Sequence, residues 1–102
     1  MLTCKDKHIN FKKIKKDSII KYNFVFYNTS NESVEILSHE ASCNCTELKI
    51  SKKIISPKDS VSIKMIVETK KKSIGNHIVN STIKTNGITS FYHLSLKFEL
   101  VN

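Results

Sequence analysis

Apolar and polar residues alternate along most of the chain, with a period of two residues. The alternation is clearest in three segments whose large apolar side chains take every second position. These positions are Ile20, Tyr22, Phe24 and Phe26; Val61, Ile63, Met65 and Val67; and Tyr92, Leu94, Leu96, Phe98 and Leu100. A period of two places these side chains on one face of a β-strand, and such one-sided alternation is typical of antiparallel sheets with one solvated face.

Turn-favouring residues separate these segments. Pro57 has a fixed φ that suits the second position of a turn, and Asn86-Gly87 is a strong hairpin signal. Gly75 marks a further break. Strands at such spacing predict an all-β fold, and specifically an immunoglobulin-like β-sandwich of seven or eight mostly antiparallel strands.

The length of the chain fits one domain with one hydrophobic core. It has 102 residues, and no linker or low-complexity tract divides them. We expect a single sandwich domain at residues 9–102, preceded by an N-terminal extension at residues 1–8.

The formal net charge of +8 raises the question of an anionic partner. All 17 basic residues are lysines, however, and arginine is the usual reader of phosphates and guanine edges. We therefore expect no nucleic-acid binding and interpret the lysines mainly as a solvated surface. Lysine-driven adhesion to anionic surfaces is a weaker alternative, which salt would screen.

Targeting signals are few. No stretch approaches the roughly 20 apolar residues of a membrane span, and the first residues contain no signal-peptide core. The protein is then cytoplasmic, or a leader was removed. Cys4, near a lysine-rich start, is a candidate site for a lipid anchor.

No catalytic constellation is visible. A serine-type triad needs a nucleophile on a tight turn, and Ser42 has no glycine-flanked elbow. The nine acidic residues are spread singly along the chain. We predict that the protein is not an enzyme.

The order of several short elements resembles a bacterial family of domains of unknown function, DUF1573, which is related to ASH-like and other immunoglobulin-like modules. The elements are Asn10-Phe11, Ile14–Ser18, Phe24–Asn28, Ser42–Thr46, Ile55–Ser60, Gly75 and Thr85-Asn86. Cys-x-Cys-Thr and Phe-x-Phe-x-Asn are the most specific of them. The resemblance implies a secreted, periplasmic or cell-envelope binding module and carries over no catalytic residue.

Two positions depart from the pattern of that family, which usually has glycine at both. Asn44 can tolerate a left-handed backbone, so the turn around it is expected to persist. Lys58 suits a type I turn that begins at Pro57 and needs no positive φ.

Cys43 and Cys45 are the residues with the most distinctive chemistry, and they leave three alternatives open. They are small buried thiols, a reversible disulfide, or ligands of a soft metal. A disulfide between residues two apart in an extended strand lies near the outer limit of the Cα separation, so it requires strain or a local turn. A copper or zinc site would recruit His39, although no cofactor is required by the sequence.

The leading hypothesis for function is a non-enzymatic binding or adaptor module with a protein partner. Its expected contact residues are Ser42, Cys43, Asn44, Cys45 and Thr46, because small polar groups decorate this loop. The rival hypothesis is a thiol-redox or metal-handling protein that uses Cys43 and Cys45.

Overall fold

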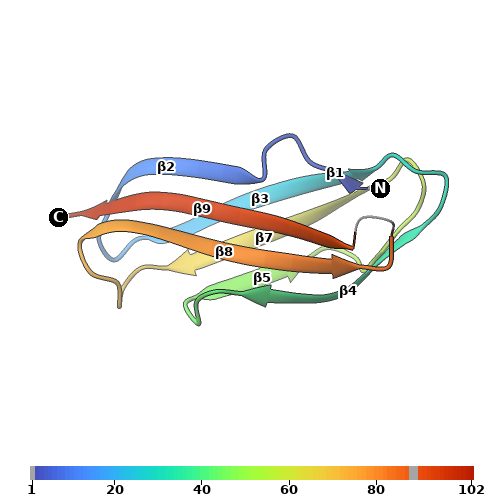
Figure 1. Ribbon diagram of the computed structural model, residues 1–102. Coiled ribbons are helices and arrows are strands. Elements are labelled where there is room, and N and C mark those ends of the chain that lie inside the picture. The colour runs from blue at the N-terminus through green and yellow to red at the C-terminus, as the bar shows by residue number, and fades with distance from the viewer. Residues whose placement is uncertain (1, 88–89) are drawn as a thin grey trace.

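The computed structural model describes residues 2–87 and 90–102, and within them the chain forms nine β-strands and no helix (Figure 1). The strands are β1 (Leu2–Thr3), β2 (His8–Lys15), β3 (Ile19–Asn28), β4 (Val34–Ala41), β5 (Thr46–Ile50), β6 (Ile54–Ile55), β7 (Ser60–Glu68), β8 (Gly75–Thr85) and β9 (Phe91–Val101). No helix in the described part of the chain is long and apolar enough to span a membrane.

The strands form two sheets that pack face to face. In the described residues one sheet has the order β1-β3-β7-β5 and the other has the order β2-β9-β8-β4-β6. The pairings are antiparallel except between β2 and β9, which are parallel. The predicted immunoglobulin-like sandwich is confirmed. Its strands outnumber the predicted seven or eight, because β1 and β6 have two residues each, too few to show an alternation.

The core lies between the sheets and contains the residues that alternate in the sequence. Phe24, Phe26 and Phe98 are among its largest fully buried side chains. Tyr22, predicted to face inward, is only half-buried. Its ring meets that of Phe11 on β2 at a centroid distance of 5.9 Å, where the chain passes from one sheet to the other.

The segment expected to form an N-terminal extension contributes to the sandwich. Leu2 is buried in the core, and its backbone N–H donates to the hydroxyl of Tyr92 at 2.9 Å. Thr3 pairs with Tyr27 in β1, and His8 already begins β2. One buried residue in a two-residue strand leaves no periodic signal, and residue 1 lies outside the described part.

The buried side chain of Asn28 joins three segments at the end of the sandwich where β3 finishes. Its amide nitrogen donates to the carbonyl oxygens of Glu32 at 2.8 Å and Ile55 at 2.9 Å. Its amide oxygen accepts from the backbone N–H and the hydroxyl of Ser30, at 3.0 and 2.6 Å. Its backbone exchanges two further hydrogen bonds with the turn at Lys58 and Asp59. The Asn of Phe-x-Phe-x-Asn therefore has a structural role.

The turn that contains Pro57 differs from the prediction. The N–H of Asp59 donates to the carbonyl of Ser56 at 3.0 Å, which closes the turn. Lys58 has a φ of 64°, so the turn follows the type II pattern, whose third position favours glycine. The expected type I turn at Lys58 is wrong. Asn44, by contrast, is not among the described residues with positive φ.

Replacing Asn28 by alanine is expected to lower the free energy of unfolding by on the order of 3 kcal/mol, because two carbonyls and one N–H lose their buried partner. Urea unfolding followed by circular dichroism measures this loss. Asn23→Ala, an exposed position on the same strand, is the control and should change stability by less than about 0.5 kcal/mol. Equal losses in both variants would contradict the role given to Asn28.

Replacing Lys58 by glycine is expected to raise stability by about 0.5 kcal/mol, because relief of the left-handed backbone outweighs the added freedom of the unfolded chain. The exposed loop residue Lys70, which is not among the described positive-φ residues, supplies the comparison. Lys70→Gly should instead destabilise the protein, and paired urea titrations should show opposite signs. A loss in both variants would refute the strain at Lys58.

Candidate functional site

A disulfide joins Cys43 to Cys45 where the chain leaves β4 in one sheet and enters β5 in the other. The two Cα atoms are 5.2 Å apart, well within the ordinary range for a disulfide. The chain achieves this separation by turning: the N–H of Thr46 donates to the carbonyl of Cys43 at 3.1 Å. Of the two geometries considered for a bridge, the local turn is the one observed.

Both flanks of the disulfide turn are fixed to a sheet. On the β4 side, the N–H of Ser42 donates to the carbonyl of Asn80 at 2.8 Å, and the N–H of Asn80 donates to the Ser42 hydroxyl at 3.0 Å. On the β5 side, the N–H of Glu68 donates to the carbonyl of Cys45 at 3.0 Å. Ser42, predicted as a contact residue, thus extends the ladder between β4 and β8.

The turn combines a half-buried base with an exposed apex. Cys43 and Cys45 are half-buried and pack against the hydrophobic core, but as bridged sulfur atoms and not as the free thiols of the first alternative. Asn44 is exposed at the apex, and Thr46 begins β5. The core fixes the sulfur atoms, and Asn44 is presented to solvent on a rigid base.

The structure does not assemble the metal site considered for Cys43, Cys45 and His39. The two sulfur atoms are bonded to each other, so neither is a thiolate. His39 lies on β4 and lines a separate hollow that also contains Ile36 and Ile50. Within residues 2–87 and 90–102, no three His, Cys, Asp or Glu side chains are placed to hold one ion.

Two hollows adjoin the disulfide turn. One, of about 310 Å³, is lined by Asn44, Cys45, Glu68 and Lys71. The other, of about 220 Å³, shares Asn44, Cys45 and Glu68 with the first. It is completed by Ile19, Thr46, Glu47 and Ile66. Sequence reasoning missed Glu68, Lys71 and Ile19, because strand pairing brings them to the turn. Of these three residues, Lys71 alone belongs to a feature that stands out in the sequence, the run of lysines at Lys70–Lys72.

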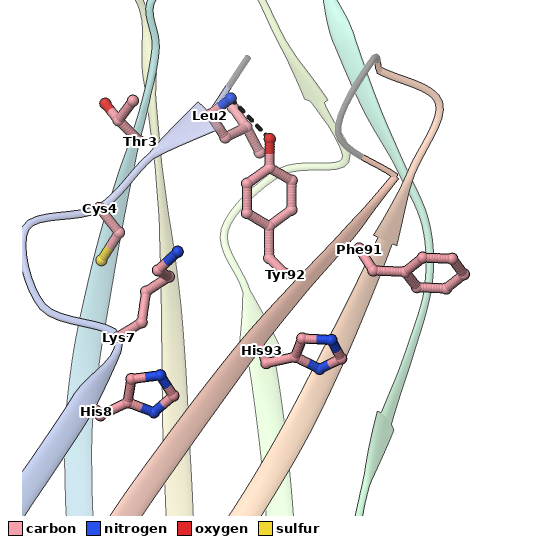
Figure 2. A pocket seen from close by; sticks show the side chains of 8 residues that line it. All are labelled: Leu2, Thr3, Cys4, Lys7, His8, Phe91, Tyr92 and His93. Carbon is pink, nitrogen blue, oxygen red and sulfur yellow. Dashed lines mark hydrogen bonds between the residues drawn. The ribbon is translucent and has the colours of Figure 1, made fainter.

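A third hollow, of about 380 Å³, lies at the end of the sandwich that contains β1 (Figure 2). Figure 2 shows Cys4 and Lys7 on one side and Tyr92 and His93 of β9 on the other. Burial raises the pKa of the Cys4 thiol, whose sulfur donates to the carbonyl of Asp6 at 3.4 Å. A protonated thiol is a weak nucleophile and a weak ligand.

The imidazoles near this hollow also have partners. His93, predicted to be solvated, is exposed, and its Nδ1 lies 3.1 Å from the Thr82 hydroxyl. Nδ1 of His8 lies 2.6 Å from the Ser95 hydroxyl. These pairs sit on the solvated face of the sheet, and no described carboxylate bonds either imidazole. A triad needs such an orienting acid, so the described residues of this hollow form no triad of that type.

Cys4, the candidate site for a lipid anchor, lies between β1 and β2, and the anchor stays a prediction. Here Leu2 fills part of the core, and β1 pairs with β3. The Cys4 side chain itself is half-buried and packs against the core.

Removing the disulfide is expected to cost little stability. A bridge that closes so short a loop constrains the unfolded chain by only about 1.5 kcal/mol in the chain-entropy model. The variant C43S/C45S should therefore keep the circular dichroism spectrum of the wild type and lose about that free energy of unfolding. Dithiothreitol should lower the urea midpoint of the wild type but not that of the variant. Global unfolding upon reduction would show that the bridge holds the fold.

Comparisons with solved structures place the fold among immunoglobulin-like and PapD-like domains. A protein of unknown function from Porphyromonas gingivalis W83 matches with a TM-score of 0.85 and 13% identity, over 97% of this chain and 46% of that one. The ASH/PapD-like domain 7 of human CEP192 matches with a TM-score of 0.74 and 6% identity, over 99% and 85%. At such identities the likeness concerns the fold alone.

A further neighbour is part of an enzyme. A family 123 glycoside hydrolase from Clostridium perfringens matches with a TM-score of 0.76 and 9% identity, over 94% of this chain but only 23% of the hydrolase. The chain also spans less than half of the Porphyromonas protein. Among curated proteins, none matches the sequence.

The family comparison covers almost the whole chain. The model of the family described as protein of unknown function, DUF1573, matches residues 2–100. The match includes the Phe-x-Phe-x-Asn element that closes one end of the sandwich and the Cys-x-Cys-Thr element of the disulfide turn. The chain belongs to the DUF1573 family.

Proposed function

We propose that this domain is a non-enzymatic protein-binding or adaptor module, whose contact surface is the disulfide turn with its two adjoining hollows. The observation that carries the proposal is the exposed apex at Asn44, set between hollows of about 310 and 220 Å³. Because both flanks of the turn are bonded to the sheets, the surface needs little ordering when a partner binds.

The chemistry of the described residues supports binding rather than catalysis. Imidazoles are the commonest general bases, and those of His8 and His93 bond hydroxyl groups on a sheet face. The disulfide turn itself offers an amide, a hydroxyl and a carboxylate, from Asn44, Thr46 and Glu47. Such groups donate and accept hydrogen bonds at a protein interface without a reaction.

The disulfide also supports an extracytoplasmic location, in the periplasm, the cell envelope or the medium. Bridges of this kind persist in oxidising compartments and are rare in the reducing cytosol. The bridge between Cys43 and Cys45 closes a loop too short to stabilise the fold greatly. Such a bridge fits an oxidising compartment, where the disulfide forms and is not reduced.

Thiol–disulfide exchange is a second candidate function, favoured by one observation: Cys45 lines both hollows. A partner thiolate would attack Sγ of Cys45, form a mixed disulfide and release Cys43 as a thiolate. A second thiol of the partner would then break the mixed bond. The partner gains a disulfide, and the domain becomes the dithiol.

Asn44→Trp tests the contact surface, because a large neutral side chain at the apex would block a partner that fits the hollows without changing the charge of the surface. The measurement is capture of native proteins by the immobilised domain from an envelope extract of the producing bacterium. Asn31→Trp, an exposed position in the connection between β3 and β4, is the matched control. We expect the first variant to lose the captured proteins and the second to keep them. Retention by both variants would refute the placement.

The variant C43S separates the two candidate functions. In an exchange protein, the remaining Cys45 thiol would attack the disulfide of an oxidised partner and hold it as a mixed disulfide that dithiothreitol releases. In an adaptor, C43S/C45S and C43S should both capture the same proteins without a covalent bond. Non-reducing electrophoresis distinguishes these results.

A further inference from the structure

We propose that the contact surface continues onto a cluster of lysines, and that the partner segment bound there is acidic, rich in aspartate and glutamate. This inference rests on the proposed function and adds the chemistry of the partner. The cluster, called the lysine end, lies at the end of the sandwich that carries the C terminus in Figure 1. It consists of Lys15, Lys16, Lys70, Lys71 and Lys72.

Two segments far apart in the sequence meet at the lysine end. Thr69 is completely buried, and its hydroxyl and its N–H both donate to the carbonyl of Ser18, at 2.6 and 3.3 Å. Lys72 turns back through an N–H bond to the carbonyl of Thr69 at 2.9 Å. These bonds fix the loop of Lys70–Lys72 against the turn that follows Lys16. The backbone therefore holds these two lysine-bearing segments side by side.

The charges gathered here are not neutralised within the domain. The described part of the chain has one ion pair between side chains, which joins Lys52 to Asp59. This pair lies at the opposite end of the sandwich, where β7 begins. Four carboxylates lie near the lysine end, on Asp17, Glu68, Glu99 and Glu47, and none is in an ion pair there. Lys13 lies opposite Glu99 in the pairing of β2 with β9, so with it six ammonium groups against four carboxylates leave an excess of positive charge. Repulsion among them disfavours the free state, and an anionic partner would relieve it.

The lysine end is continuous with the proposed contact surface. Lys71 lines the hollow of about 310 Å³ together with Asn44 and Cys45. A segment that covers the disulfide turn and follows this hollow therefore reaches the ammonium group of Lys71 next. Hydrogen bonds would be made at Asn44, and ionic contacts would follow along the loop.

The composition of the lysine end favours carboxylates over nucleic-acid phosphates. Phosphate readers rely on the planar guanidinium fork, and the sequence contains no arginine. Lysine offers a point charge that pairs with a carboxylate without a fixed orientation. An acidic protein segment with variable spacing of its carboxylates suits such a surface.

The probe for this inference is a fluorescein-labelled peptide of about eight glutamates, long enough to cross the 22 Å width of the sandwich. Fluorescence anisotropy at about 0.15 M salt measures its affinity. The test variant is K70Q/K71Q/K72Q. The control is K53Q/K58Q/K84Q, which removes the same charge from exposed positions away from the lysine end. We expect the first to weaken binding about tenfold and the second by less than about twofold.

Three results would overturn the inference. Equal weakening by both variants would mean that only net charge matters. Binding of a glutamine octapeptide as tight as that of the glutamate peptide would remove the role of carboxylates. Tighter, Lys70–Lys72-dependent binding to vesicles of about one-third phosphatidylglycerol would assign the lysine end to membranes instead, with exposed Ile74 beside it.

The native partner separates this inference from the function on which it depends. If Asn44→Trp abolishes capture from the extract while K70Q/K71Q/K72Q leaves it unchanged, the adaptor function stands and the acidic partner is refuted. If neither variant changes capture, the proposed contact surface is refuted, and the acidic partner is refuted with it. We expect both variants to lose the same proteins.

Discussion

The buried amide of Asn28 is the interaction on which the rest of the sandwich depends. The described part of this sandwich has no helix to cover its ends, so the loops there must satisfy their own polar groups. Asn28 supplies four side-chain hydrogen bonds at one end and joins the connection after β3, strand β6 and the turn before β7. Since β3 and β7 form the centre of one sheet, the network fixes the strand with which β5, one flank of the disulfide turn, is paired.

The extent to which the sequence predicts this fold follows from strand length. Strands such as β3, β7 and β9 have nine or more residues, and their alternation reveals both the strand and its buried face. The two-residue strands β1 and β6 have no period to detect. The parallel pairing of β2 with β9 is equally invisible, because alternation does not specify a neighbour. At Lys58, the backbone follows the demands of the turn, and the residue pays a local conformational cost.

The candidate site divides in the same way. Cys43, Asn44 and Cys45 are neighbours in the sequence, so their chemistry can be read directly, and the local backbone decides whether the two sulfur atoms can form a bridge. Glu68 and Lys71 reach the hollow because β5 pairs with β7, a contact between residues about 20 positions apart. Non-local pairing of this kind determines which charges surround the disulfide, and no local pattern encodes it.

The two ends of the sandwich differ in how their polar groups are balanced. Around Asn28 the hydrogen bonds are satisfied within the chain, and Lys52 pairs with Asp59, which lowers the pKa of that carboxyl group. At the lysine end, the buried side chain of Thr69 fixes the loop that carries Lys70–Lys72. The ammonium groups of these lysines have no ion pair among the described residues. A short disulfide loop adds little to global stability, so its effect is to keep the neighbouring turn in one shape. An acidic partner of the kind proposed would relieve the charge that lies beside this rigid turn.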